Sequence, residues 1–319
     1  MRNNFILAFI IIPLMIVSAY AALNPVSLPY IMQKEFDGRE LKLVKVLEKH
    51  KEYIRYYITY KSGELTISGI MNAPQGSGPF PVIITAHEFI RPEIYTNGRG
   101  LKREQDYLAK RGYVVLHPDY RNHAGSDKDA ENAMKLNLGY VEDVINAVYA
   151  VKNSEFKFIN KDKVGLLGHS LGGGIGLSIM VTKPELIKAY VLFAPMSMDY
   201  RDNFNRWILR RREPKFGSPA AAHKIIALYG SPESNPEFWD NLSAKTFIKN
   251  INAPVEVHHG TADKSVPPEW SEKLVKAFKE QGKGIKFYTY TSEKHEFIRQ
   301  WPLAMKRTVD FFDEQLKQE

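Results

Sequence analysis

The chain has 319 residues, of which 44% are hydrophobic and 25% are charged, and it contains no cysteine. A chain without cysteine has no disulfide framework, no thiol nucleophile and no zinc–thiolate site. The formal net charge of +8 favours anionic surfaces in general, but no nucleic-acid-binding motif accompanies it, so we expect no nucleic-acid partner. The length and composition are typical of one large globular domain.

Residues 1–21 differ from the rest of the chain. Met1–Asn4 is a short cationic start, Phe5–Val17 is almost wholly apolar, and Ala19-Tyr20-Ala21 is a small-x-small site. This layout is typical of a secretory signal peptide, because the apolar run is shorter than the ~20 residues that span a membrane. We expect cleavage near Ala21 and export of residues 22–319 to a periplasm or the exterior. The alternative is an uncleaved N-terminal anchor, the one case in which we expect membrane attachment.

The rest of the chain alternates between strand and helix patterns. Tyr53–Tyr60 and Glu64–Asn72, joined by Lys61-Ser62-Gly63, predict an antiparallel hairpin. Further strands, most of them short apolar runs, are predicted at Val82–Ala86, Tyr113–Leu116, Val164–Leu167, Ala189–Ala194, Val255–His258 and Lys286–Tyr290. Helical patterns lie between and after them, at about 100–111, 139–152, 269–280 and 302–316. This alternation predicts an α/β protein with a mostly parallel central sheet and helices on both faces.

The connection between the strands at Ala189–Ala194 and Val255–His258 is much longer than is usual in such a fold. Residues 197–250 are therefore expected to form a cap insertion after the sixth predicted strand. Trp207 and Trp239 in this insertion are candidates for contacting a substrate from above. The alternative is that these rings pack the insertion onto the domain, as aromatic side chains on insertions commonly do.

The sequence Gly168-His169-Ser170-Leu171-Gly172 follows the predicted strand Val164–Leu167 and precedes a run of small residues. A serine on a sharp strand-to-helix turn between glycines is the nucleophile elbow of α/β-hydrolases. The glycines are needed because the turn has strained backbone angles and brings the helix against the sheet. Ser170 is therefore the candidate nucleophile.

Asp263 and His295 follow the last two predicted strands. The chain order Ser, Asp, His is that of α/β-hydrolases and differs from the orders in the chymotrypsin and subtilisin folds. We expect His295 to accept the proton of Ser170, and Asp263 to orient the imidazole and stabilise its cation. Leu171 follows the nucleophile, and its backbone N–H is expected to contribute to the oxyanion hole.

Other polar residues have structural interpretations. Asp119, Arg121 and Asp127 follow the strand Tyr113–Leu116 and are expected to form a structural ion pair, with substrate contact as the alternative. His258 and His259 are adjacent in a strand and point to opposite faces, so they do not readily bind one metal together. No metal or organic cofactor is implied.

The chain resembles the catalytic domain of the prolyl oligopeptidase family of serine peptidases and its esterase relatives, over about residues 50–316. The resemblance rests on a set of motifs before, at and after the elbow: Tyr107–Val115 with Pro118–Arg121, Lys163–Gly165 with Gly168–Gly173, and Ala253-Pro254 with His259–Asp263 and Val266–Pro268. It implies an α/β-hydrolase fold and a serine hydrolase that cleaves peptide or ester bonds through an acyl-enzyme.

Two departures from the family pattern bear on this expectation. Large members carry a β-propeller before the catalytic domain, for which we expect no room ahead of the first hairpin. His87-Glu88-Phe89 replaces the more usual His-Gly pair in the loop that supplies the second oxyanion donor. Phe89 is the preferred candidate for that donor and Glu88 the next. Tyr95 is a candidate side-chain donor, because related peptidases use a tyrosine in this loop.

The scissile bond is left open between two classes. The resemblance favours short peptides, whereas open access without a propeller favours small esters and hence a carboxylesterase. A third interpretation, from another class, is a noncatalytic binding module on a hydrolase scaffold. The presence of Ser170, Asp263 and His295 favours an enzyme, because lost activity is usually accompanied by a lost triad residue.

Overall fold

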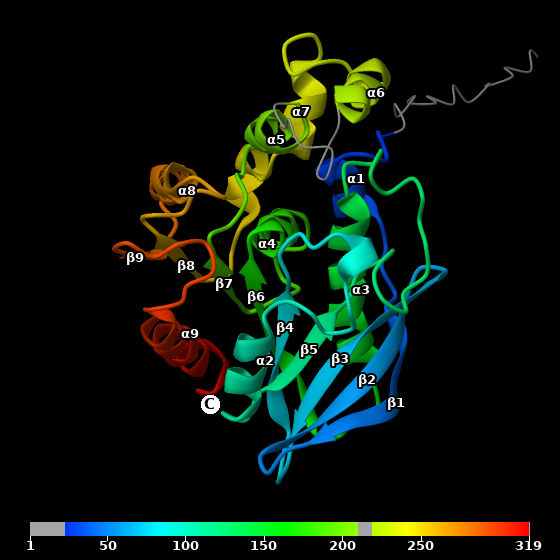
Figure 1. Cartoon of the computed structure of the whole chain (residues 1–319), viewed down its shortest axis with the longest axis vertical. Coiled ribbons are helices and arrows are strands. Elements are labelled where there is room, and N and C mark those ends of the chain that lie inside the picture. Colours follow the sequence, from blue (N-terminus) through cyan, green and yellow to red (C-terminus); the bar gives the residue numbers. More distant parts are fainter. Residues whose placement is uncertain (1–22, 210–218, 319) are drawn as a thin grey trace, which may run out of the picture.

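The computed structural model describes residues 23–209 and 219–318, so the predicted signal peptide at 1–21 lies outside the described residues. The described strands form one nine-stranded sheet in the order β1-β2-β3-β5-β4-β6-β7-β8-β9 (Figure 1). The pairs from β4 to β9 are parallel, and β1, β2 and β3 join through antiparallel pairs. The predicted fold class is confirmed.

The antiparallel part is larger than the predicted hairpin. A short helix α1 (Leu28–Gln33) precedes β1 (Arg39–Lys49), which pairs with β2 (Tyr53–Ser62), and β2 pairs with β3 (Leu65–Pro74). β1 was not predicted. Its pairing with β2 has three register shifts and most of its residues are exposed, so it lacks the strict alternation that identifies a half-buried strand.

The parallel part matches the predicted strands. It consists of β4 (Phe80–Ala86), β5 (Val114–Pro118), β6 (Ile159–His169), β7 (Ala189–Phe193), β8 (Val255–Gly260) and β9 (Lys286–Tyr290). The residues of β5, β7 and β8, and most of those in β4 and in the second half of β6, are buried because helices cover both faces of the sheet, whereas β9 at the sheet edge is largely accessible. Since parallel strands end at one edge, the loops after β4, β6, β8 and β9 meet there.

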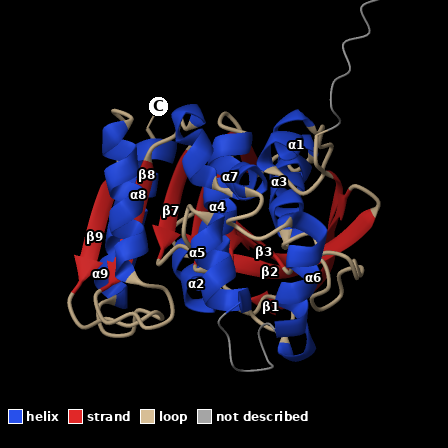
Figure 2. Cartoon of the chain, turned by 90° about the horizontal axis from the view of Figure 1, so that it is seen from above, coloured by secondary structure: helices blue, strands red, loops and turns tan. Residues whose placement is uncertain are grey.

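Helices form a layer on each face of the sheet (Figures 1 and 2). The residues of β4 illustrate this, since Ile84 and Ile83 belong to different core clusters. The cluster with Ile84 includes α3 (Leu138–Asn153), α4 (Leu171–Thr182) and α8 (Pro268–Glu280). The cluster with Ile83 includes α2 (Lys102–Ala109) and α9 (Trp301–Leu316).

The connection from β7 to β8 is a helical insertion at the edge where the parallel strands end (Figure 1). Its described elements are α5 (Tyr200–Phe204), a π-helical turn (Asn205–Leu209), α6 (Pro219–Tyr229), α7 (Pro236–Leu242) and a 3-10 segment (Ala244–Asn250). A second 3-10 turn, Pro92–Ile94, lies in the loop after β4. The insertion thus covers the carboxyl ends of the strands.

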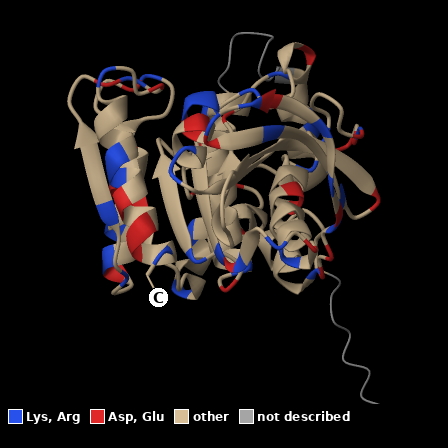
Figure 3. Ribbon diagram, turned by 90° about the horizontal axis from the view of Figure 1, so that it is seen from below, with Lys and Arg blue, Asp and Glu red and all other residues tan. Residues whose placement is uncertain are grey.

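Charged side chains are sparse on the central strands, whereas both signs occur on the outer helices and loops (Figure 3). The edge strand β1 carries charges of both signs, among them Glu40, Lys42 and Lys45. Charges and register shifts on an edge strand oppose its pairing with another chain. Within the described residues, no helix has the length and hydropathy needed to cross a bilayer.

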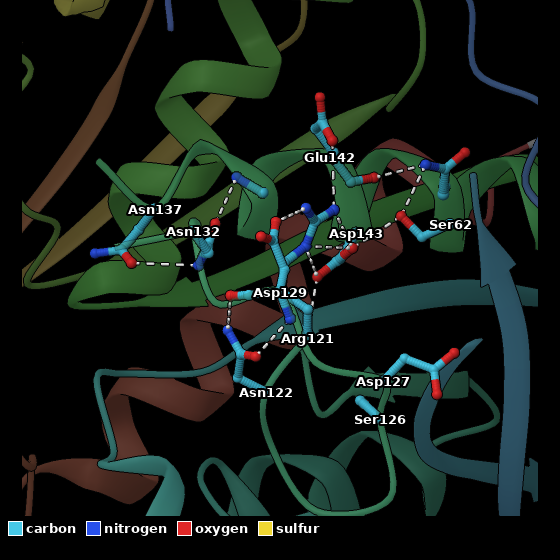
Figure 4. Close-up of polar contacts among 12 residues, drawn as sticks. Ser62, Arg121, Asn122, Ser126, Asp127, Asp129, Asn132, Asn137, Glu142 and Asp143 are labelled. Carbon is cyan, nitrogen blue, oxygen red and sulfur yellow. Dashed lines mark hydrogen bonds and ion pairs between the residues drawn. The ribbon is translucent and has the colours of Figure 1, made fainter. Parts of the chain in front are cut away.

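Arg121, in the loop after β5, holds that loop against α3. Its guanidinium donates to Asp143 Oδ1 at 2.8 Å, to Asp129 Oδ2 at 3.0 Å and to Glu142 Oε2 at 3.3 Å (Figure 4). The Asp143 side chain is fully buried. The loop fixed in this way continues into α3 through Leu136, which lines the site described below.

The predicted ion pair of Arg121 with Asp119 or Asp127 is wrong. Asp127 accepts the backbone N–H of Thr66, and buried Asp119 accepts four other donors described below. Arg121 instead finds three carboxylates, two of them on α3, because the chain after β5 folds back over the start of that helix.

Replacing Arg121 with methionine is expected to lower the free energy of unfolding by about 3–5 kcal/mol, because it leaves the buried Asp143 carboxylate without its cation. Urea denaturation followed by circular dichroism measures the effect. The double variant Arg121→Met/Asp143→Leu is expected to recover much of the loss, since an apolar pair often replaces a buried ion pair without penalty. A loss below about 1 kcal/mol in the single variant would contradict this account.

Candidate active site

The predicted elbow is present between β6 and α4. Ser170 has φ 54° and ψ −113°, a conformation that L residues rarely adopt. A Cβ on Gly172 would overlap the carbonyl oxygen of Ala86 on β4, and a Cβ on Gly168 would overlap the backbone of Gly172. Both glycines are therefore required for α4 to approach the sheet. Ser170 N–H donates to Phe193 O on β7 at 2.9 Å, which fixes the turn.

His295 and Asp263 meet at the same edge, in the loops after β9 and β8. His295 Nδ1 and Asp263 Oδ2 are 2.6 Å apart. The other oxygen, Asp263 Oδ1, accepts the backbone N–H groups of Ser265 and Val266 at 2.8 and 2.9 Å. The carboxylate is thus held from both sides and orients the imidazole, with its Nε2 left for another partner.

Asp263 is stabilised as a carboxylate. Burial raises its pKa, but hydrogen bonds from His259 and His295 outweigh burial and hold the pKa of Asp263 well below its ordinary value. His259 Nε2 lies 3.3 Å from Asp263 Oδ2. The second ring nitrogen of His259 is 2.7 Å from Ser271 Oγ on α8. This contact anchors the loop after β8 that carries Asp263, called the acid loop below.

Ser170 and His295 line one cavity of about 340 Å³. Its walls are mostly apolar and come from α4, from the loops before α3 and after β7, and from the insertion. Representative lining residues are Leu138, Ile175, Met196, Trp207, Ile208 and Leu242. A mostly apolar cavity with a few polar groups at one end is the usual form of a small-molecule site. The geometry thus joins a nucleophile, a base and a binding volume.

The three predicted oxyanion residues lie around this cavity. Leu171 is the first residue of α4, a position whose N–H has no acceptor within its own helix. Phe89 and Glu88, in the loop after β4, line the cavity as well, and the Phe89 side chain is 41% exposed. The structure therefore brings Leu171, Phe89 and Glu88 together with Ser170.

Tyr95 does not line the cavity. Its side chain is buried, and its hydroxyl donates to Asp119 Oδ1 at 2.8 Å. The same carboxylate accepts the backbone N–H of Gly98 and the side chains of Asn97 and Ser68. Tyr95 thus stabilises the loop that carries Phe89 instead of facing the substrate, because a fully buried carboxylate requires donors on every side.

The two tryptophans of the insertion have different environments. Trp207, in the π-helical turn, lines the cavity. Trp239, on α7, is fully buried and donates from Nε1 to Gly230 O at 3.2 Å. Trp239 packs against Phe204 and Phe238, so it belongs to the core of the insertion and does not line the cavity.

Several lining residues were not predicted. Leu136 comes from the loop before α3 and Leu138 from the first position of α3, while Met196 and Met198 come from the loop after β7. Their position after parallel strands was a usable signal, since such loops meet at the edge that holds Ser170. Among the described residues, no group of three or more candidate ligands is placed to hold a metal ion.

Arg206 connects the insertion to the acid loop. Its guanidinium donates to Lys264 O at 2.7 Å and to Ser265 O at 2.9 Å, directly after Asp263. Arg206→Ala is expected to lower kcat about 5- to 30-fold, because the two lost hydrogen bonds together are worth about 1–2 kcal/mol in positioning Asp263. Steady-state hydrolysis measures the change.

Arg201→Ala is the matched control for Arg206→Ala. Arg201, on α5, binds Asp240 and the carbonyl of Pro236 within the insertion and does not reach the acid loop. It is expected to leave kcat unchanged. Equal losses in both variants would mean that the insertion as a whole, and not its link to Asp263, governs the rate.

A serine on a strand–helix elbow, a histidine hydrogen-bonded to an aspartate and a shared cavity, on a mostly parallel sheet, define a serine hydrolase with the α/β-hydrolase fold. The model of the prolyl oligopeptidase family matches residues 100–319, well over half of the chain. The chain therefore belongs to the prolyl oligopeptidase family, as its motifs suggested.

Relatives within this family differ in length. The uncharacterized peptidase YtmA of Bacillus subtilis (strain 168) is 23% identical over 77% of this chain and 88% of its own length. Dipeptidyl aminopeptidase BIII of Pseudoxanthomonas mexicana is 25% identical over 72% of this chain and 32% of its own length. The chain thus spans most of one relative and about a third of the other.

Solved structures share the fold over similar shares of this chain. Acylaminoacyl peptidase of Pyrococcus horikoshii superposes with a TM-score of 0.66 and 21% identity, over 85% of this chain and 43% of that one. Est1E of Butyrivibrio proteoclasticus, solved with bound ferulic acid, superposes with a TM-score of 0.63 and 18% identity, over 82% of this chain and 99% of that one. At these identities the similarity establishes a common fold.

Proposed function

We propose that the protein is an exported serine peptidase that hydrolyses short peptides through a covalent acyl-enzyme, with Ser170, His295 and Asp263 as its catalytic triad. The observation that carries the proposal is the 2.6 Å contact between His295 and Asp263, beside a strained elbow serine that lines the same cavity as His295. Membership of a peptidase family supports the peptide substrate.

In the first half-reaction His295 Nε2 takes the proton of Ser170 Oγ as the oxygen attacks the scissile carbonyl carbon. Asp263 stabilises the imidazolium that forms, because its carboxylate stays ionised. His295 then gives the proton to the leaving nitrogen or oxygen, and the acyl group remains on Ser170. In the second half-reaction His295 activates water, which releases the acid and restores the serine.

The tetrahedral oxyanion needs preset donors. Leu171 N–H at the start of α4 is one, favoured further by the positive end of the helix dipole. Phe89 N–H, from the loop after β4, is proposed as the second. Buried Asp119 and its donors, Tyr95 among them, hold this loop in place, so the donor is positioned before substrate arrives.

Ester hydrolysis is the second candidate function. The mostly apolar cavity suits an acyl or aryl group, and the Est1E fold is matched over nearly its whole length. The same triad can hydrolyse an ester more easily than an amide, because the leaving oxygen of an ester needs less protonation than an amide nitrogen. The two functions differ in the leaving group alone, so a matched pair of substrates separates them.

The test compares a short-chain p-nitrophenyl ester with prolyl and alanyl p-nitroanilides, using residues 22–319 and the Ser170→Ala variant. Cleavage of an anilide that disappears in the variant supports the peptidase. Cleavage of the ester alone would make the protein a carboxylesterase. Failure of Ser170 to react with an organophosphonate would favour a noncatalytic binding module. Mass spectrometry of the mature protein recovered from its producing cells tests cleavage after Ala21.

A further inference from the structure

A second cavity of about 230 Å³ adjoins the first on the other side of Glu88. Glu88, His295 and Glu296 line both cavities, while Gly100 and His169 line the second. Glu88 therefore stands in the wall between two spaces that both reach the proposed base. Neither the triad nor the oxyanion hole uses its carboxylate, so that group needs another explanation.

The Glu88 carboxylate is incompletely partnered. Oε2 is buried and accepts no hydrogen bond from any described residue. His169 Nδ1 lies 3.7 Å from this oxygen, an ion-pair distance that is too long for a hydrogen bond. Arg103 also lines the second cavity, but it donates to Glu296 O at 2.9 Å and stacks over Trp301.

The charge of Glu88 lies close to where negative charge develops in the reaction. Burial raises the pKa of Glu88, but His169 outweighs burial and the pKa is about 2, so the group is ionised at neutral pH. Glu88 directly precedes Phe89, the proposed oxyanion donor. A carboxylate beside an oxyanion repels it, and the repulsion is stronger than in bulk water where the carboxylate is partly removed from solvent. A cation close to Glu88 would remove this cost.

Resting on the proposed function, we propose that Glu88 binds the free α-ammonium group of the substrate, so that the enzyme prefers unblocked aminoacyl peptides or esters with an apolar first side chain. The α-ammonium of such a substrate is two bonds from the scissile carbonyl carbon. When that carbon is bound at Ser170, the ammonium group lies close to the elbow, next to Glu88 and His169.

The first cavity complements this assignment. Its apolar walls, with Leu138, Ile175 and Met196 among them, accept an apolar side chain from the same α-carbon. A substrate with a blocked amino group offers Glu88 no charge and leaves its buried oxygen Oε2 without a hydrogen bond, which is costly. Glu88 is therefore expected to disfavour N-acylated substrates as well as to favour substrates with a free amino group.

The test is the ratio of kcat/KM for leucine p-nitroanilide to that for N-acetyl-leucine p-nitroanilide, repeated with the corresponding p-nitrophenyl esters. The wild-type ratio is expected to exceed one, and Glu88→Gln is expected to lower it about 10- to 100-fold. This range corresponds to one charged hydrogen bond. Glu93→Gln, on the same loop but exposed and outside both cavities, is expected to leave the ratio unchanged.

Binding gives a readout that does not depend on turnover. In a Ser170→Ala background, calorimetry is expected to show tighter binding of leucinamide than of N-acetyl-leucinamide, and loss of this difference on adding Glu88→Gln. A wild-type preference for the acetylated compounds, or an equal effect of Glu88→Gln on both, would overturn the inference. Failure of Ser170 to label with a fluorophosphonate would instead overturn the proposed function, while the binding comparison still decides the role of Glu88.

Discussion

Replacing Ser170 with alanine is expected to lower kcat about 10⁴- to 10⁶-fold on every substrate that the protein cleaves, because it removes the hydroxyl that is proposed to form the acyl-enzyme. Ser170 directly follows β6, lines the cavity with His295, and precedes the proposed donor Leu171. Steady-state hydrolysis with active-site titration measures the loss. The remaining rate, from the oxyanion hole and binding, should exceed that of water.

The strained backbone supplies a control for this variant. Alanine at position 170 keeps the strain of φ 54°. Ser170→Gly removes this strain, which is worth about 1–3 kcal/mol, but destabilises the folded state by about 0.5–1 kcal/mol because glycine loses more chain entropy on folding. Ser170→Gly should therefore be inactive yet about 1 kcal/mol more stable than Ser170→Ala in urea denaturation. Hydrolysis that persists in both variants would remove Ser170 from the mechanism.

Replacing Asp263 with asparagine is expected to lower kcat about 10⁴-fold, the loss that follows when the acid of such a triad no longer selects the tautomer of the histidine. The carboxylate accepts from His295 at 2.6 Å, and the amide nitrogen of asparagine can donate to the same ring nitrogen. His295 would then carry its proton on Nε2, which leaves no base facing Ser170. Pre-steady-state hydrolysis of the best ester measures the step.

The pH dependence provides a check on the same residue. The pKa of Asp263 is lowered in the folded protein, so the stability it contributes is present above its unfolded pKa of about 3.9 and is lost as the pH falls through the folded value. Asp263→Asn should flatten this acid limb of the stability curve. Asp310→Asn, exposed on α9 and paired with Lys306, is the control and should change neither kcat nor the acid limb.

The local rules of the sequence were sufficient to predict the elbow and the pairing of Asp263 with His295. Glycines around Ser170 predicted a turn that the structure confirms, because a Cβ at Gly172 has no space against β4. Short apolar runs predicted the buried strands, since parallel strands covered on both faces show this pattern. Residues that follow such strands meet at one edge, which is why Asp263 and His295 were predictable as partners.

Long-range packing decided the features that the sequence pattern did not predict. β1 has an irregular register and an exposed surface, so its pairing with β2 was not visible in its residues. Tyr95 was a candidate side-chain donor to the oxyanion, but its hydroxyl donates to the buried carboxylate of Asp119. Trp239 packs into the insertion, and Trp207, of the same residue type, lines the cavity. Residue type and position in the chain did not distinguish these cases.

The sequence by itself therefore determined the fold class, the elbow and the order of Ser170, Asp263 and His295, because backbone sterics and strand burial act over a few residues. The tertiary structure alone decided which side chains line the cavity and which groups surround Glu88. Those contacts join the loop after β4, the elbow, the loop before α2 and the loop after β9. These segments are far apart in the chain, so the balance of burial and charge among them exists only after they have packed together.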